Sequence, residues 1–299
     1  MIQKKILILG SSGGLGKQLD NKFTESGFDV FLVNRKLIDV EKNFNKVKNL
    51  IYKIKAKYII NCIAKTGSKP CEENPIQAFN INSLFPHKVA EVAKKINSKL
   101  IHFSTDAVFQ GNKFKKIYKE SDNPHPITTY GQTKLYGEIL LKNYVNTLII
   151  RLPILFGLTQ KNQIIDRLVS KLFEGKEIKA SSDVFSTPVY NIDIANFILN
   201  LIRKNKFDFF VKRCNGVIHL SSEKYISLLD FMKKIGKITK KTKLIKSAKE
   251  SDFKSKFVKP QYLGLQSNYQ NNIRKIYNVG TNSKINEYIK EISNAHYFN

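Results

Sequence analysis

Apolar and amphipathic stretches alternate along the first half of the chain. The run Ile6–Leu9 is apolar throughout, as is typical of a central strand in a parallel sheet that is covered on both faces. The pattern predicts further strands at residues 29–33, 38–40, 57–62 and 99–103, and helices at residues 15–26, 41–57, from 74 onward and from 130 onward. This alternation predicts an α/β fold with a doubly wound parallel sheet.

Glycines at positions 10, 13 and 16 follow the first strand and open the first helix. Gly10 allows a tight turn, Gly13 lets the backbone approach a pyrophosphate, and Gly16 lets the helix pack close to the strand. The helix N-terminus adds N–H groups and a partial positive charge for phosphates. Because strand, turn and helix come in the required order, the segment predicts a Rossmann-like dinucleotide site.

The end of the second strand carries the residues that select the cofactor. Asn34, Arg35 and Lys36 stand there, where an acidic residue would bind the ribose 2′-hydroxyl of NAD and a basic residue suits the 2′-phosphate of NADP. NADPH is therefore the predicted cofactor, although NADH stays open because surface charges are common in so basic a chain. The strand at residues 38–40, with Asp39 and Val40, is predicted to form the adenine edge.

Polar residues follow later strands and begin a later helix. Residues 61–64 and 104–106 follow strand ends, so they are expected to converge with the glycine turn at the carboxyl edge of the sheet. Tyr130 and Lys134 are four residues apart and therefore share one helix face. A nearby ammonium would lower the pKa of the phenol from its ordinary value of about 10, which predicts a usable acid near neutral pH.

Composition excludes several classes of protein. The chain has 299 residues, 42% of them hydrophobic, and a net charge of +27, which raises nucleic acid or an anionic membrane as a partner. Only six of the 51 basic residues are Arg, whereas phosphate and base recognition favours the Arg fork, so neither partner is expected. Three cysteines without a CxxC pair predict neither disulfides nor a metal site. A cytoplasmic protein without membrane segments is the expectation.

Two strings in the chain are specific to one family. Ser104-Thr105-Asp106-Ala107-Val108-Phe109-Gln110-Gly111 and Tyr130-Gly131-Gln132-Thr133-Lys134-Leu135-Tyr136-Gly137-Glu138 resemble the matching strings of extended short-chain dehydrogenase/reductases that reduce nucleotide-linked sugars. Asn61-Cys62-Ile63-Ala64 and the C-terminal segment from Lys259 to Ser267 resemble further family segments. Past residue 151 the chain departs from the family pattern, because it contains no Trp and has Pro188-Val189 in place of Pro-Thr.

The resemblance implies an NADPH-dependent reductase of a nucleotide-activated 4-keto sugar, used in surface polysaccharide biosynthesis. Tyr130 would donate the proton, Lys134 would bind the nicotinamide ribose and tune Tyr130, and Thr105 would hydrogen-bond the carbonyl oxygen. The implied cofactor contacts are Gly10, Ser12, Gly13, Gly14, Leu15, Gly16, Arg35, Lys36, Asp39, Val40, Cys62, Ile63, Ala64, Tyr130 and Lys134. The implied substrate contacts are Thr105, Asp106, Ala107, Val108, Arg151 and Pro153.

The resemblance also implies a division of the chain. Residues 1–157 would form the cofactor domain, with segments near 183–220 returning to it, and residues 158–299 would mainly form a smaller substrate domain. In that second half the pattern predicts helices at residues 161–174 and 192–202 and a strand at 217–220. A homodimer is compatible with this organisation.

Two other functions stay open at this point. One is a sugar-nucleotide epimerase or dehydratase of the same fold, which cycles a bound NAD; the absence of an acid directly after Asp106 argues against a dehydratase. The other is a catalytically idle relative that binds NADP and regulates a partner enzyme, against which the intact Thr105, Tyr130 and Lys134 argue.

Overall fold

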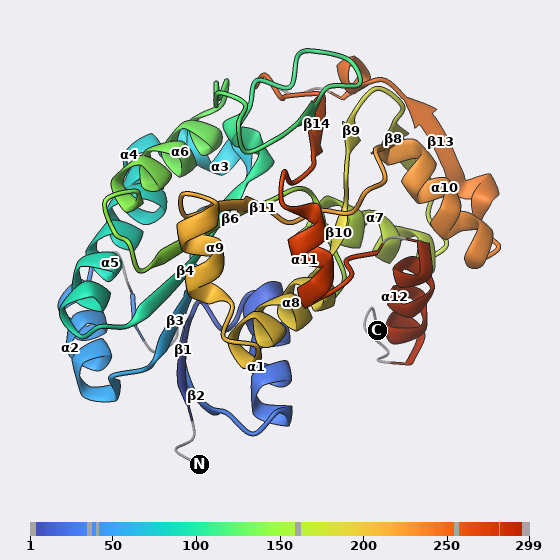
Figure 1. The fold of residues 1–299 in the computed structure, drawn as a ribbon. Coiled ribbons are helices and arrows are strands. Elements are labelled where there is room, and N and C mark those ends of the chain that lie inside the picture. The colour runs from blue at the N-terminus through green and yellow to red at the C-terminus, as the bar shows by residue number, and fades with distance from the viewer. Residues whose placement is uncertain are drawn as a thin grey trace.

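A six-stranded parallel sheet lies at the centre of the half of the molecule that contains the N-terminus (Figure 1). The computed structural model describes residues 4–34, 38–39, 42–158, 163–253, 257–280 and 282–294. The strand order is β11-β6-β4-β3-β1-β2, and every pairing in this sheet is parallel. The strands are β1 (Lys5–Leu9), β2 (Asp29–Val33), β3 (Tyr58–Asn61), β4 (Lys99–Thr105), β6 (Thr147–Leu152) and β11 (Val217–His219).

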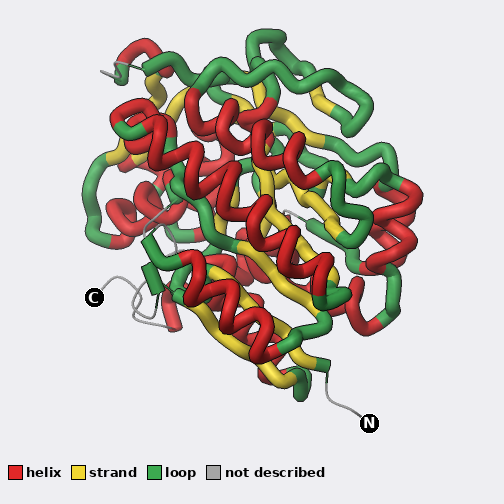
Figure 2. Tube along the Cα trace, turned by 90° about the vertical axis from the view of Figure 1, so that its left-hand side faces the viewer, coloured by secondary structure: helices red, strands yellow, loops and turns green. Residues whose placement is uncertain are grey.

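Helices cover both faces of this sheet because its strands are apolar on both sides. Ile6 and Ile8 of β1 pack in a core with Leu19 and Phe23 of helix α1, whereas Leu7 and Leu9 face the opposite core. The first layer contains α1 (Gly14–Glu25), α8 (Asn191–Arg203) and α9 (Phe207–Arg213), and the second contains α2 (Phe44–Ile54), α5 (Phe85–Lys95) and α6 (Thr129–Leu141). Figure 2 shows helices crossing in front of the strands. The predicted doubly wound α/β fold is confirmed.

Most predicted elements of this half occur within a few residues of their expected bounds. The predicted strand at 38–40 is wrong for the residues described, because Ile38 and Asp39 lie outside any strand and Val40 is outside the described residues. The helix predicted from residue 74 begins at Pro75, but it consists of α4 (Pro75–Phe79), a π-helical turn η1 (Asn80–Leu84) and α5. The short helix α3 (Ser68–Glu73) was not predicted.

The C-terminal half has an apolar core of its own. Its elements are α7 (Ile164–Phe173), β8 (Ile178–Ser181), β12 (Ile226–Ser227), α10 (Leu228–Ile238), β13 (Ile245–Ala248), α11 (Gln270–Ile276) and α12 (Asn282–Asn294). Short strands connect the halves: β5 (Ile117–Tyr118), β7 (Leu155–Phe156), β9 (Phe185–Ser186), β10 (Val189–Tyr190) and β14 (Tyr262–Leu265). None of the helices in the described part of the chain is long and apolar enough to cross a membrane.

The path of the chain interleaves the two cores. After α7 and β8 the chain returns with α8, α9 and β11 to the large sheet, where β11 pairs with β6. Strand β5, which comes early in the chain, pairs with β14 near the C-terminus. The domain boundary at residue 157 stays a prediction.

Candidate active site

The turn after β1 requires glycine at two positions. Gly10 has φ +87°, and a side chain there would lie 3.0 Å from the backbone of Cys62. At Gly16 a Cβ would lie 2.3 Å from the carbonyl oxygen of Gly10, so only glycine lets α1 pack this close to the turn. These contacts agree with the predicted structural roles of both residues.

The N-terminus of α1 has the character of an anion site. Its N-cap is Gly13, which offers no side chain, and its first turn contains no acidic residue. A Cβ on Gly13 would meet only the Gly10 carbonyl oxygen, at 3.5 Å, so the backbone is open to a ligand there. A pyrophosphate fits this cradle because the helix dipole and N–H groups favour negative charge.

The other predicted cofactor residues include those that follow β3 and β2. Cys62, Ile63 and Ala64 directly follow β3, where the N–H of Cys62 donates to the Leu9 carbonyl oxygen at 2.8 Å and so joins this loop to the end of β1. Burial raises the pKa of the Cys62 thiol. Asp39 is exposed, whereas Arg35, Lys36 and Val40 lie outside the described residues, so the prediction of NADP selectivity rests on the sequence alone.

Thr105 and Asp106 lie at the carboxyl end of β4. The Thr105 hydroxyl donates to Asp106 Oδ1 at 3.0 Å and accepts the N–H of Ala107 at 3.2 Å. Asp106 is buried, and its Oδ2 has no hydrogen-bond partner among the described residues. Burial is the main reason that the pKa of the Asp106 carboxyl is raised to about 7. An acid that ionises near neutral pH therefore lies beside Thr105.

Tyr130 is brought to Thr105 by the start of α6. The Thr128 hydroxyl accepts the N–H of Gly131 at 3.1 Å and caps the helix. A Cβ on Gly131 would lie 2.1 Å from the Ala107 carbonyl oxygen, so this glycine lets α6 approach the segment after β4. As a result, Tyr130 lies close enough to Thr105 and Asp106 for both side chains to act on the pKa of its phenol.

Lys134 is buried one turn further along α6, as the i, i+4 spacing predicts. Its Nζ donates to the Phe103 carbonyl oxygen at 2.6 Å and lies 3.1 Å from His102 Nε2. Desolvation lowers the pKa of Lys134 to about 8. The expectation that Lys134 lowers the pKa of Tyr130 is wrong for the protein alone: burial raises the Tyr130 pKa, and the amino group contacts His102 and Phe103 instead.

Two predicted substrate residues are engaged inside the protein. The Arg151 guanidinium is 4% exposed and pairs with Glu138, with Nη2 donating to Oε2 at 2.7 Å. The Val108 side chain is fully buried in a small core with Phe109, Tyr118 and Leu265. Both side chains are thus engaged by other residues of the protein, and their contacts to a substrate stay predictions. Ala107 and Pro153 are buried near the strand ends and stay predictions.

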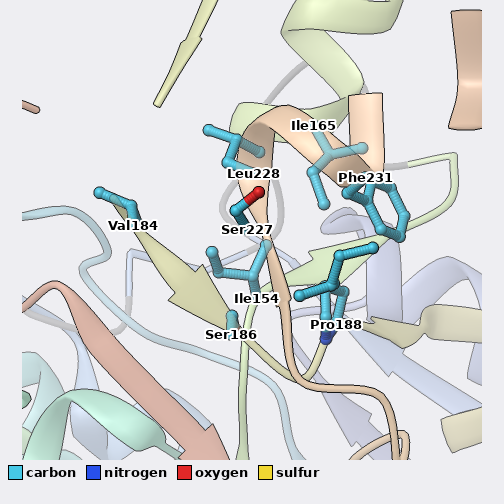
Figure 3. A pocket seen from close by; sticks show the side chains of 9 residues that line it. Ile154, Ile165, Val184, Ser186, Pro188, Ser227, Leu228 and Phe231 are labelled. Atoms are coloured by element: carbon cyan, nitrogen blue, oxygen red, sulfur yellow. The ribbon is translucent and has the colours of Figure 1, made fainter. Parts of the chain in front are cut away.

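A small pocket lies in the C-terminal half, and Ile154, the residue after Pro153, is part of its lining (Figure 3). Most of its lining is apolar, with two serine side chains among the lining residues Ile154, Ile165, Val184, Ser186, Pro188, Ile226, Ser227, Leu228 and Phe231. It includes none of Thr105, Tyr130 or Lys134. Its link to the predicted site residues is Ile154, which directly follows Pro153 in the chain.

Asn82 and Glu138, whose buried hydrogen bonds connect the elements that carry the candidate site, were not predicted from the sequence. The side chain of Asn82, in the π-helical turn, accepts the Lys65 N–H at 2.9 Å and donates to Thr133 Oγ1 at 3.1 Å. Glu138 binds Arg151 and Ser104, whose hydroxyl donates to Oε1 at 2.5 Å. Tyr-x-x-x-Lys-x-x-x-Glu spacing could have placed Glu138 on the face of Tyr130 and Lys134.

The fold and the site define the class of extended short-chain dehydrogenase/reductases. The features of this class that the chain has are the doubly wound sheet, the glycine turn after β1, and Thr105, Tyr130 and Lys134 near the end of β4. The comparison with protein families is more specific: the RmlD substrate binding domain matches residues 4–294. The chain belongs to this family.

Known relatives and structures agree with this assignment. The chain is 31% identical over 230 residues to dTDP-4-dehydrorhamnose reductase of Aggregatibacter actinomycetemcomitans, covering 76% of each chain. It is 27% identical to methionine adenosyltransferase 2 subunit beta of Danio rerio, covering 75% of this chain and 70% of the relative. The crystal structure of dTDP-4-dehydrorhamnose reductase from Bacillus anthracis in complex with NADP is similar with a TM-score of 0.85 and 26% identity, covering 97% and 100% of the two chains.

Proposed function

We propose that this protein is an NADPH-dependent reductase of a nucleotide-activated 4-keto sugar, similar to dTDP-4-dehydrorhamnose reductase. The observation that carries the proposal is that Tyr130 lies next to Thr105, whose hydroxyl is hydrogen-bonded to the buried Asp106. Two hydroxyl donors held together at the strand ends suit the reduction of a carbonyl, whose oxygen gains negative charge as the reaction proceeds. The 31% identity to a reductase of this type supports the choice of substrate class.

The chain's own residues perform the proton transfer in this proposal. Because burial raises the pKa of Tyr130, its phenol keeps its proton at neutral pH and is in the donating form that a reduction requires. Thr105 would donate a second hydrogen bond to the same carbonyl oxygen, for which its hydroxyl hydrogen must turn away from Asp106 Oδ1. Lys134, when protonated, places positive charge near the phenolate that remains after Tyr130 gives up its proton.

The cofactor would be held by the turn of residues 10–16 and the loop of residues 62–64. NADPH supplies the hydride for the keto carbon. Gly10 and Gly16 shape the turn, and the N-terminus of α1 would bind the pyrophosphate. Arg35 and Lys36 are the proposed contacts to the 2′-phosphate.

Consumption of NADPH with dTDP-4-dehydrorhamnose tests the function directly. We expect Tyr130→Phe to lower turnover by about 10²–10⁴-fold, the usual contribution of a general acid, while NADPH binding is retained, because only one hydroxyl is removed. Tyr136→Phe is the matched control, because Tyr136 lies on the same helix and is 54% exposed. Near-normal turnover of Tyr130→Phe would exclude this residue as the acid.

A regulatory function is the second candidate, supported by the similarity to methionine adenosyltransferase 2 subunit beta. A protein of that kind would bind NADP without consuming it. If the wild-type protein binds NADPH but oxidises it with no nucleotide-linked 4-keto sugar, the regulatory function replaces the reductase. If it interconverts nucleotide sugars without net consumption of cofactor, the epimerase alternative is correct.

A further inference from the structure

Asn61, His102 and Lys134 form a buried chain of polar contacts behind the candidate site. Asn61 and His102 are direct neighbours in the register of β3 and β4, and Asn61 Nδ2 lies 3.1 Å from His102 Nδ1. On the other side of the ring, Nε2 lies 3.1 Å from Lys134 Nζ. All three residues are at most 1% exposed, so water does not replace these contacts.

The backbone of the next loop determines which way Asn61 points. The N–H of Ile63 donates to Asn61 Oδ1 at 3.0 Å, which leaves the Nδ2 group facing His102. An amide NH₂ is only a donor, so His102 Nδ1 must present its lone pair. Burial and the neighbouring Lys134 hold the pKa of His102 well below its ordinary value, so the ring is neutral and carries its one hydrogen on Nε2.

This tautomer is in conflict with a charged lysine. An ammonium group has three donors and no acceptor, so a Lys134 ammonium and the Nε2–H of His102 would face each other as two donors. A neutral Lys134 amine removes the conflict, since it accepts from Nε2–H while it donates to the Phe103 carbonyl oxygen. The observed orientation of Asn61 therefore favours the neutral amine.

A charged Lys134 requires the opposite arrangement. His102 must then accept at Nε2 and carry its hydrogen on Nδ1, which requires the oxygen of Asn61 to face the ring. If the side-chain amide of Asn61 flips in this way, Oδ1 no longer accepts the hydrogen bond from the Ile63 N–H. That N–H belongs to the loop of residues 62–64, which is part of the proposed cofactor site.

We propose that His102 is a positioning residue whose tautomer couples the charge of Lys134 to the backbone of the Asn61–Ala64 loop. With His102 protonated on Nε2, Lys134 is neutral and the Ile63 N–H is bound by Asn61. With His102 protonated on Nδ1, Lys134 is charged and the Ile63 N–H is released toward the cofactor side. Its effect on catalysis rests on the proposed reductase function, whereas the tautomer change does not.

Other groups near Lys134 act on its charge as well. Glu138, one turn along α6, favours the ammonium, but this carboxylate is paired with Arg151 of β6. Cys62, after β3, also faces the amino group, and burial raises the pKa of its thiol, so it is neutral. Tyr130 on α6 and Asp106 after β4 interact electrostatically with each other. Among these groups, His102 is the one that contacts both the Lys134 amino group and the side chain of Asn61.

Nitrogen NMR of the histidine rings tests the tautomer without any substrate. The chain has five histidines and far more lysines, so the histidine signals are the practical probe; His102→Gln identifies the signal of His102, and His87→Gln is the control for assignment. As the pH rises through about 8, where Lys134 loses its proton, we expect His102 to change from the Nδ1–H to the Nε2–H tautomer. A ring that keeps one tautomer from pH 6 to pH 10, or becomes an imidazolium in this range, overturns the coupling.

Asn61→Asp tests the same coupling through activity. A carboxylate can accept from both Ile63 N–H and His102 Nδ1–H, so it fixes the tautomer that accepts from a charged Lys134. Because Asp106 also ionises near pH 7, the pH profiles are compared in an Asp106→Asn background. There we expect Asn61→Asp to raise the pH at which kcat declines on the alkaline side by one unit or more, and the NMR signal of His102 to stay in the Nδ1–H form. An unchanged pH profile in a folded Asn61→Asp protein contradicts the inference. If the wild type reduces no keto sugar at all, the proposed function fails, and the NMR titration still decides the tautomer.

Discussion

The buried pair of Glu138 and Arg151 allows a quantitative test of the site's framework. Glu138 is 0% exposed and accepts from Arg151 Nη2 at 2.7 Å and Nε at 3.0 Å, and it also accepts from the Ser104 hydroxyl at 2.5 Å. Removing one member of a buried ion pair leaves the other charge without its partner, which costs about 3–5 kcal/mol. We expect Arg151→Leu and Glu138→Leu each to lose about that much stability.

The double variant shows how much of each single loss comes from leaving one buried charge without its partner. With both residues changed to Leu no buried charge is left unpaired, so the loss should be several kcal/mol smaller than the sum of the two single losses. Glu25→Ala is the control, because its ion pair with Lys22 is 64% and 30% exposed and should change stability by less than about 1 kcal/mol. Urea unfolding with linear extrapolation measures all four variants.

Stability and KM measured on the same Arg151→Leu variant decide whether Arg151 supports the fold or binds substrate. A side chain that only supports the fold should, when replaced, lower stability and leave the KM of the folded fraction near its wild-type value. If Arg151→Leu is as stable as the wild type but raises KM for the sugar nucleotide, the guanidinium binds substrate. That result would refute the reasoning from its burial and support the substrate contact that the sequence predicts.

Three further predictions concern the ligands. NADPH should bind more tightly than NADH, and Arg35→Ala should reduce the difference, as measured by fluorescence titration of both cofactors; equal affinities unaffected by the substitution would contradict this. The carboxyl of Asp106, with its pKa raised to about 7, should slow reduction as it ionises, so kcat falls above pH 7, and Asp106→Asn should remove this part of the pH profile. Added salt should reduce kcat/KM more than kcat, because the net charge of +27 attracts anionic ligands over a Debye length of about 8 Å; submicromolar binding of DNA at physiological salt would contradict this interpretation of the charge.

The sequence was sufficient to predict features that depend on short segments. The apolar run Ile6–Leu9 and the glycines after it predict the central strand and its turn, because one continuous segment contains the strand, the turn and the helix. Tyr130 and Lys134 could be placed on one face for the same reason, since the helical repeat fixes their relation. Asp29–Val33 was predicted with the bounds that the structure has.

The partners of these residues could not be predicted, because they depend on the register of distant strands. Asn61 reaches His102 only because β3 and β4 pair with these residues side by side. Glu138 and Arg151 belong to different elements, and nothing local indicates that they form an ion pair. The segment near Ile38 was misassigned because three apolar and polar residues in alternation are too few to distinguish a strand from a loop.

The effect of Lys134 on the pKa of Tyr130 was predicted wrongly for the same reason, because it depends on residues of other strands. Helical spacing alone predicts that the ammonium lowers the pKa of the phenol, but a buried lysine takes the nearest acceptors, and here these are the Phe103 carbonyl oxygen and His102. Burial then raises the pKa of Tyr130, which keeps the phenol protonated. For an enzyme that reduces a ketone this is the useful form, because the acid must still hold its proton when the hydride arrives. In the proposed reaction Lys134 would therefore act through its charge after proton transfer, and in the proposed coupling that charge depends on His102 and Asn61.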